Sequence, residues 1–299
     1  MTTLTRRLAA ASTVFVVSLA TIIVAAPAHA ADPPMCGDVI VTDTVLTADL
    51  VCDGSSDGLI IDADGVTLDL RGHTISGPGA YKTPFAAVRV ARHKDVTVTR
   101  GTVTGFQSGV VLDEAWCNTV SKITAIRNDQ GINLAGGGGH VVKQSTVSGN
   151  GRDGVRLGLS KDNTITQNTL DDNTWGITVA DGSSGNLVSK NTVTKSGDIG
   201  LNTFGGAMGT TFQQNSVTGS TGDGIVAGAD TTANKVVQNQ SFGNGGAGIR
   251  VANTAVIKNT AVNNVGQGII ASGTSTDGGG NKAAGNAEPQ CVGVVCSAP

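Results

Sequence analysis

Five side chains in the middle of the chain are of types that can together hold a sugar ring and act on it: Gln130, Asn133, Asp153, Arg156 and Trp175. A guanidinium presents two donors that match a carboxylate, an indole offers a flat apolar surface to a pyranose, and a carboxylate can accept a proton. Asp153 and Arg156 are therefore predicted to be catalytic, and the other three are predicted to bind substrate. The alternative is a solvated strand face with an Asp–Arg pair and an indole that covers a loop.

These residues belong to two series that recur about every 22 residues. The first series lies between two apolar residues and contains Arg89, Val111, Asn133, Arg156, Thr178, Asn202, Val226 and Arg250. The second series lies just before a Gly and contains Ser108, Gln130, Asp153, Trp175, Ile199, Asp223, Ala247 and Gln267. In a stack of strands, neighbours in a series lie about 4.8 Å apart, so the two series predict a polar groove. Arg89, Asp223 and Arg250 are predicted to bind substrate in the same groove.

Both series lie in a four-residue repeat of the form Gly, apolar, any residue, apolar, or directly before it. It begins at Gly58, Gly109, Gly131, Gly154, Gly176, Gly200, Gly224, Gly248 and Gly268, and once at Ala87. A second alternating stretch follows in the coils, as in segment 163–170. Alternation with a period of two indicates short strands with one buried face. The sequence therefore predicts an all-β protein, a right-handed single-stranded parallel β-helix of about ten coils.

An Asn recurs five residues into the second stretch and predicts a structural ladder of stacked side chains. Its members are Asn168, Asn191, Asn215, Asn239, Asn259 and Asn286. A partial second ladder contains Asn150, Asn173, Asn244 and Asn264. Stacked amides can donate to and accept from one another, and Asn tolerates the left-handed backbone of a sharp turn. We interpret these residues as scaffold and not as ligand contacts.

The first 30 residues have the features of a signal peptide. Arg6 and Arg7 precede an apolar run from about Val14 to Ala26, and small residues end at Ala30. The run is shorter than the roughly 20 residues that span a bilayer, and no later run is long enough to suggest a membrane partner. The sequence therefore predicts that residues 1–30 are removed and that a secreted, extracellular protein begins near Ala31.

The charge balance argues against a nucleic-acid partner. The formal net charge is -3, and removing the two arginines of the signal peptide leaves about -5. The chain shows no Lys/Arg-rich stripe of the kind that nucleic-acid-binding proteins use. We expect a monomer whose partner is a polysaccharide.

The cysteines lie near the two ends of the predicted stack, apart from Cys117. In an oxidising compartment, Cys36 can pair with Cys52 and Cys291 with Cys296. Cys117 is predicted to be a free thiol and a small buried residue. The predicted organisation is an N-terminal cap at 31–57, coils at 58–273 and a C-terminal cap or tail at 274–299.

No residue pattern assigns a metal or another cofactor. His73, His93 and His140 fall in different coils without the spacing of metal ligands. Asp62 and Asp64 flank one turn, and Asp171 and Asp172 flank another, so Ca²⁺ binding stays open at either. Acidic residues are also common in turns that bind no ion.

Three segments carry a resemblance to a known family: 36–40 (Cys-Gly-Asp-Val-Ile), 50–52 (Leu-Val-Cys) and 64–75 (Asp-Gly-Val-Thr-Leu-Asp-Leu-Arg-Gly-His-Thr-Ile). With the repeats that follow, the chain resembles secreted bacterial right-handed parallel β-helix repeat proteins of the pectin-lyase-like superfamily. Members with known activity include pectate lyases, polygalacturonases, alginate lyases and mannuronan epimerases, so the resemblance implies a polysaccharide substrate. The sequence departs from each catalytic subgroup, because it lacks a His-Gly dipeptide, Asp-Pro-His-Asp and Arg-x-Pro-x-x-Arg.

Three classes of function follow from these observations. The first is an enzyme acting on acidic, uronate-containing polysaccharide, by lyase or epimerase chemistry. The second is a carbohydrate-binding or cell-envelope protein without catalysis. The third, a structural or ice-binding solenoid, requires a flat face of repeated Thr, which the two outward series do not supply because they mix Arg, Asn, Val and Thr.

Overall fold

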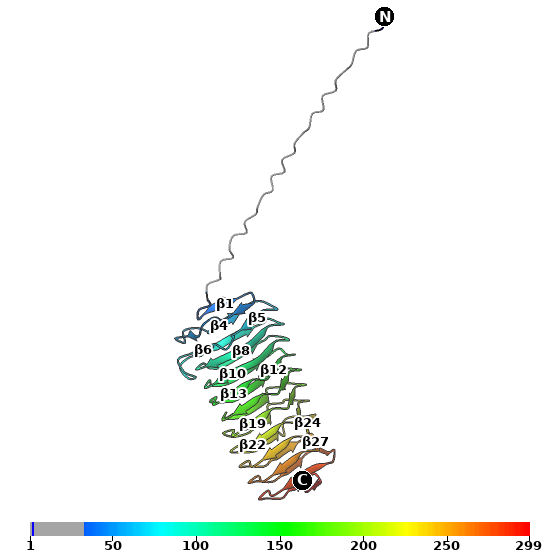
Figure 1. Cartoon of the computed structure of the whole chain (residues 1–299). Helices are drawn as coiled ribbons and strands as arrows, with labels where there is room; N and C mark the ends of the chain where they lie inside the picture. The colour runs from blue at the N-terminus through cyan, green and yellow to red at the C-terminus, as the bar shows by residue number, and fades with distance from the viewer. Residues whose placement is uncertain (1, 3–32) are drawn as a thin grey trace. The chain divides into compact units, whose positions relative to one another are not determined.

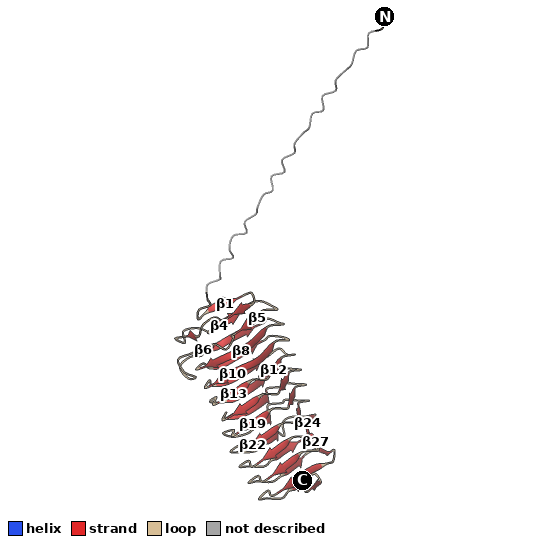
Figure 2. Cartoon of the chain, in the orientation of Figure 1, coloured by secondary structure: helices blue, strands red, loops and turns tan. Residues whose placement is uncertain are grey.

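The computed structural model describes Thr2 and residues 33–299. The predicted signal peptide, apart from Thr2, lies outside the described residues. Every regular element in residues 33–299 is a β-strand, and the strands form a stack of parallel rungs (Figures 1 and 2). None of the described residues form a helix that is long and apolar enough to cross a lipid bilayer.

One face of the stack, which we call sheet A, contains twelve parallel strands. In order they are β1 (Asp38–Ile40), β4 (Leu59–Ile61), β7 (Ala86–Ala91), β9 (Ser108–Asp113), β11 (Gln130–Ala135), β14 (Asp153–Gly158), β17 (Trp175–Ala180), β20 (Leu201–Thr203), β23 (Ile225–Ala227), β26 (Ile249–Ala252), β29 (Ile269–Ser272) and β32 (Cys291–Val292). The predicted right-handed parallel β-helix is confirmed. The stack has two more rungs than the repeat predicts, because the cysteine-containing segments at both ends also form strands, β1 and β32.

The rest of each rung forms two further faces. Face B contains β2 (Thr44–Val45), β5 (Thr67–Asp69), β8 (Thr97–Thr104), β10 (Thr119–Ile126), β12 (Val141–Lys143), β15 (Thr164–Thr166), β18 (Leu187–Ser189), β21 (Thr211–Gln213), β24 (Asn234–Val237), β27 (Thr254–Ile257) and β30 (Thr276–Asp277). Face C contains β3 (Leu50–Val51), β6 (Thr74–Ser76), β13 (Thr146–Ser148), β16 (Thr169–Asp171), β19 (Thr192–Thr194), β22 (Ser216–Thr218), β25 (Gln240–Phe242), β28 (Thr260–Val262), β31 (Asn281–Ala284) and β33 (Cys296–Ser297). The long strands β8 and β10 cross the bend and belong to both faces.

The core is a continuous column of aliphatic side chains inside the stack. Ile132, Val155 and Ile177 are paired on adjacent rungs and have no exposed surface. Burying each such side chain contributes roughly 1.5–3 kcal/mol. The rung Gly is required by close packing, since a Cβ on Gly154 would lie 2.7 Å from the carbonyl oxygen of Gly176 on the next rung. This explains why small residues recur where the rungs are closest.

Asparagine ladders brace the bends, as predicted, but their membership differs from the prediction. The first ladder runs through Asn168, Asn191, Asn215, Asn239, Asn259 and Asn281, with each Oδ1 accepting the backbone N–H of the preceding member. Asn286 was assigned to this ladder and instead follows Asn264 in the second one, at 2.8 Å. Asn259 and Asn264 lie five residues apart, as do Asn281 and Asn286. The first residue of each pair belongs to the first ladder and the second residue belongs to the second ladder.

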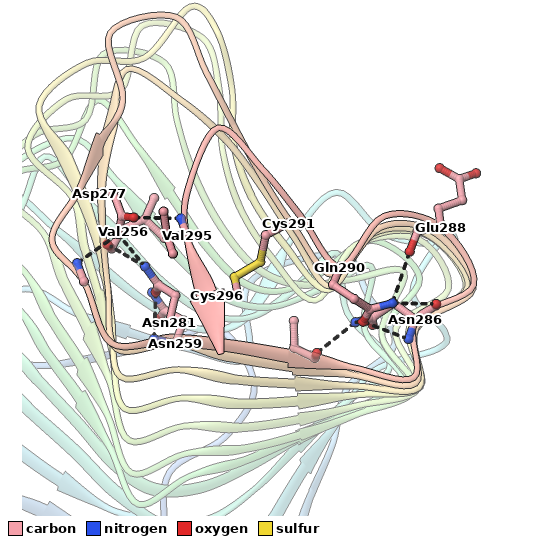
Figure 3. Close-up of a disulfide and its surroundings, with 12 residues drawn as sticks. Val256, Asn259, Asp277, Asn281, Asn286, Glu288, Gln290, Cys291, Val295 and Cys296 are labelled. Carbon is pink, nitrogen blue, oxygen red and sulfur yellow. Dashed lines mark hydrogen bonds between the residues drawn. A yellow bond between two sulfur atoms is a disulfide. The ribbon is translucent and has the colours of Figure 1, made fainter. Parts of the chain in front are cut away.

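Disulfides close both ends of the stack. Cys36 pairs with Cys52 and Cys291 with Cys296, as predicted. At the C-terminal end, Gln290 accepts from Asn286 Nδ2 at 2.7 Å and so completes the second ladder beside the disulfide (Figure 3). Cys117 is a free thiol, as predicted, but it is exposed and not buried. It lies on a turn with a φ of 54°, where its side chain points away from the core.

Candidate functional site

The strand register places the two predicted series side by side on sheet A. Asn133 on β11 pairs with Arg156 on β14, and Asp153 on β14 pairs with Trp175 on β17. The series do not form one open groove along the stack. Thr178 has no exposed surface, and only 6% of Asn202 is exposed. The part of sheet A that is open to a ligand is therefore confined to particular rungs.

Asp153 lies beneath this surface. Its carboxylate has no exposed area, and Gln130 Nε2 donates to Asp153 Oδ2 at 3.3 Å. Arg156 Nη1 lies 4.0 Å from the same oxygen, while Asp153 Oδ1 has no hydrogen-bond partner. Asp153 can therefore hold Gln130 and Arg156 in position, but it does not reach the solvent side of the sheet.

The arginines of sheet A are already paired with carboxylates. Arg156 Nη2 lies 2.5 Å from Asp181 Oδ2, in addition to its contact with Asp153. Arg89 Nε donates to Asp57 Oδ2 at 2.7 Å, and its Nη1 lies 3.8 Å from Asp113 Oδ2. These guanidinium groups therefore do not present a free fork to a uronate, as the residue types had suggested.

Three predicted binding residues lie away from the middle of sheet A or are held by other groups. Arg250 Nε donates to Asp223 Oδ2 at 2.7 Å, which repeats the Arg89–Asp57 geometry seven strands further along sheet A. Trp175 is half-buried, and its Nε1 donates to Asp198 Oδ2 at 3.0 Å. Asp223 and Arg250 form a pair of their own and are not brought together with Asp153.

The loop 77–85, inserted between β6 and β7, forms a hollow with sheet A. This first hollow, of about 290 Å³, is lined by Pro84, Phe85, Ala86, Arg89, Gln107, Ser108, Val111, Asp113, Gln130, Asn133 and Ala135. It unites three predicted binding residues, Arg89, Gln130 and Asn133. Thr83 anchors the loop, because its hydroxyl donates to Gly54 O at 3.0 Å and accepts from Phe85 N–H at 3.2 Å.

A second hollow, of about 400 Å³, adjoins the first and shares Pro84 and Gln107 with it. Its wall includes Tyr81 from the loop and Asp129 from the turn before β11. The Tyr81 hydroxyl occupies the space that a side chain on Gly151 would need, so this Gly admits the loop to the sheet. The two hollows give the loop side of sheet A one continuous polar surface.

Asp129 is a site residue that the sequence patterns did not reveal. It is buried, its Oδ1 has no hydrogen-bond partner, and its Oδ2 lies 3.7 Å from Arg152 Nη1. Burial raises the pKa of Asp129 and the charge of Asp153 raises it further, while Arg152 and Tyr81 oppose the shift. Asp129 belongs to neither recurring series, so only its position beside Asp153 in space identifies it.

Residues 33–299 contain no group of three or more His, Cys, Asp or Glu side chains placed to hold a metal ion. Asp62 and Asp64, considered above for Ca²⁺, contact the two ring nitrogens of His93 at 3.0 and 3.1 Å. The hydrogen bond with Asp62 raises the pKa of His93 despite partial burial. In the other acidic turn, Asp171 accepts from the Thr194 hydroxyl at 2.5 Å.

Comparisons with known proteins agree with this architecture. Residues 57–217 match the family model described as "right handed beta helix region". No curated protein matches the sequence. The fold is similar to that of the Dettilon tailspike protein (TM-score 0.61, 17% identity), with 85% of this chain and 60% of the tailspike chain covered. The chain thus spans less than two thirds of that protein.

Two further structures share the fold over more of their length. One is the periplasmic alginate epimerase AlgG (TM-score 0.62, 14% identity), with 86% of this chain and 75% of AlgG covered. The other is endopolygalacturonase I from Stereum purpureum, complexed with two galacturonate (TM-score 0.59, 13% identity), with 88% and 92% covered. At these identities the likeness is one of fold.

Proposed function

The chain belongs to the right-handed β-helix family, and from the hollows of sheet A we propose that it is a secreted protein that binds polysaccharide beside the loop 77–85. The observation that carries this proposal is the pair of adjoining hollows between this loop and β7, β9 and β11. Together they offer a polar trough that crosses several rungs. A polymer of sugar rings has the length to occupy it.

The chemistry of the trough suits sugar hydroxyl groups. The amides of Gln107, Gln130 and Asn133 both donate and accept hydrogen bonds, and Asp113 accepts them. Phe85 in the first hollow and the exposed Tyr81 in the second offer apolar faces to a pyranose. Arg89, the arginine of the first hollow, is neutralised by Asp57 and Asp113, so this hollow favours hydroxyl groups over the carboxylates of a uronate.

Two further observations support a polysaccharide and an extracellular location. Solved structures with this fold include an alginate epimerase and an endopolygalacturonase complexed with galacturonate. The two disulfides require an oxidising compartment, and the sequence features of residues 1–30 are those of a secretory signal.

A binding experiment tests the site. The purified secreted protein is titrated calorimetrically with neutral and uronate-containing polysaccharides. For a neutral polysaccharide that binds, Asn133→Ala should weaken binding at least tenfold, a loss of about 1.4 kcal/mol. Asn202→Ala is the matched control, since it removes the same side chain from the same series outside the hollow. Equal affinity of both variants, or no binding by any polysaccharide, would show that this trough is not the site.

Turnover is a second candidate function, favoured by the two buried carboxyl groups. Asp129, with its raised pKa, lines the second hollow together with Tyr81, and Asp153 lies beneath the surface on the adjacent rung. Asp129 can exchange a proton with a substrate in this hollow, as lyase or epimerase chemistry requires. New absorbance from unsaturated uronates tests the lyase, and NMR of the polymer tests the epimerase. If the protein turns substrate over, Asp129→Asn should abolish product while binding persists.

A further inference from the structure

A row of hydrogen-bond donors follows the bend between face B and face C over nine consecutive rungs. We call it the donor ridge, and its members are Arg71, Arg100, Lys122, Gln144, Gln167, Lys190, Gln214, Gln238 and Lys258. All nine have a left-handed backbone, with φ between 50° and 59°. Backbone hydrogen bonds tie successive ridge positions together, such as Gln167 N–H to Ser189 O and Lys190 N–H to Gln213 O. The ridge is therefore held rigidly by the rungs beneath it.

A series of hydroxyl groups lies beside the donor ridge on face C. The strand register stacks Thr74, Thr102, Thr124, Thr146, Thr169, Thr192 and Ser216 in one column. From Thr102 onward each member follows a ridge residue by two positions, and each side chain is at least partly exposed. The two outward series of sheet A contain no such run of Thr, so this column emerges only from the register of face C.

The ridge differs from sheet A in its charge. Five of its members are cations and none is acidic. Arg100 pairs with Asp69, but Arg71, Lys122, Lys190 and Lys258 are exposed and form no ion pair within residues 33–299. The sequence shows no basic stripe, because these cations are separated by one or more whole coils. On a chain of net charge -3, the ridge is a local concentration of unpaired positive charge.

Two further hollows, distinct from those of sheet A, lie between the donor ridge and the hydroxyl column. The first, of about 440 Å³, is lined by Arg71, Arg100, Lys122, Thr102 and Thr124 over a floor of Gly72 and Gly101. The second, of about 470 Å³, is lined by Lys190, Gln214, Asn215, Ser216, Gln238 and Gln240. Side-chain donors therefore line both hollows, and hydroxyl groups accompany them as Thr102 and Thr124 in the first and as Ser216 in the second.

We propose that the donor ridge and the hydroxyl column form a second binding face, for a linear anionic polysaccharide that carries carboxylate or sulfate groups. Ridge positions recur about every 4.8 Å along the stack, so an extended polymer parallel to the axis meets a donor at each rung. The unpaired cations attract its charged groups, and the Gln and Thr side chains bind its oxygen atoms. The face is separate from the trough of sheet A and does not depend on it.

Charge-matched variants test this face. One double variant, Arg71→Gln/Lys122→Gln, removes two unpaired ridge cations. The control, Lys94→Gln/Lys161→Gln, removes two exposed lysines from the turn after sheet A. With polygalacturonate and chondroitin sulfate as probes, the ridge variant should bind at least tenfold more weakly than the unmodified protein, and the control should bind as it does. Equal binding by the two double variants would overturn the proposal.

Three further measurements separate this face from other sources of binding. Affinity for the acidic polymers should fall as salt rises from low to physiological ionic strength, because exposed charges are screened. Galacturonate monomer and inorganic sulfate should not displace the polymers. Displacement by either one at equal charge concentration would show that the face binds single anions and not an extended polymer. Arg71→Gln/Lys122→Gln should leave the binding of a neutral polysaccharide to the trough of sheet A unchanged, because neither residue lines that trough. A loss of neutral-polysaccharide binding in this variant would contradict the separation of the two faces.

Discussion

At the scale of single residues, His140 shows how closely the fold controls protonation. A third ladder runs through Asn118, His140, Asn163 and Asn186, with His140 at a position that the other members fill with Asn. Its Nδ1 accepts from Asn118 N–H at 3.2 Å, and Asn163 Oδ1 accepts from His140 N–H at 2.9 Å. Nδ1 must therefore be unprotonated, and the buried Nε2 has no partner. Burial lowers the pKa of His140 from 6.5 to about 4. The folded chain keeps this imidazole neutral.

This lowered pKa predicts an acid-sensitive stability. Between pH 6.5 and 4 the unfolded chain binds a proton at His140 that the folded chain does not, so stability falls as the pH falls through this range. A shift of this size corresponds to about 3 kcal/mol. His140→Asn should remove this loss and supply an amide like its ladder neighbours. Thermal melts should therefore diverge below pH 6.5, with the variant more stable. Parallel curves for the two proteins would contradict the assignment.

At the scale of elements, the Asn ladders hold the bends of neighbouring rungs together. Asn191 Nδ2 donates to Asn215 Oδ1 at 3.0 Å and to Ile165 O at 2.9 Å, and its Oδ1 accepts from Asn168 N and Nδ2, both at 3.0 Å. Each of these groups is buried. The Asn side chains therefore provide hydrogen-bond partners for backbone N–H and C=O groups at a turn, where pairing between strands cannot.

Asn191→Ala should consequently destabilise the protein much more than Asn202→Ala. The first change leaves buried groups on two neighbouring rungs without partners, at roughly 1–3 kcal/mol for each. Asn202 is also largely buried, but its Oδ1 has no hydrogen-bond partner, so removing this oxygen leaves no other group unsatisfied. We expect a loss of about 2–4 kcal/mol against less than about 1 kcal/mol, measured by urea unfolding. Equal losses would mean that the ladder contributes little.

At the scale of the whole molecule, stability is distributed rung by rung, because each coil contacts only its neighbours in the stack. The ends lack one neighbour, and the disulfides lie at those ends. The Cys36–Cys52 bond closes a loop with a sequence separation of 16, and such a loop is worth about 3 kcal/mol in the chain-entropy model. The bond thus stabilises the rungs that have the least support.

Cys36→Ser/Cys52→Ser should therefore loosen the stack locally. Hydrogen exchange should accelerate in β1 to β6 and stay unchanged in central strands such as β14 and β17. Cys117→Ser is the control, since the exposed free thiol makes no structural bond and its loss should leave every exchange rate as it was. Uniform acceleration through the stack in the double variant would indicate a single cooperative unit.

The amino-acid sequence was enough to predict the parallel β-helix, both disulfides and the two outward series of sheet A. These features depend on short-range alternation and on a nearly constant coil length, so the stacking register follows directly from the repeat. The spacing of Asn133 and Arg156 by one coil already predicted their pairing on neighbouring strands. Ladder membership was less well determined, because Asn281 and Asn286 lie five residues apart and both fit the pattern of a ladder position.

Contacts between coils determine which of these positions are open to solvent and which charges are unpaired. Asp153 and Thr178 have outward positions in the repeat, yet both are fully buried. The hollow beside β11 depends on the loop 77–85, an insertion that no periodicity describes. Arg156 is neutralised by Asp181 from the next rung, whereas Lys122 on the donor ridge has no such partner among residues 33–299. Burial and ion pairing depend on atoms that the fold brings together from different coils, so a one-dimensional pattern does not specify them.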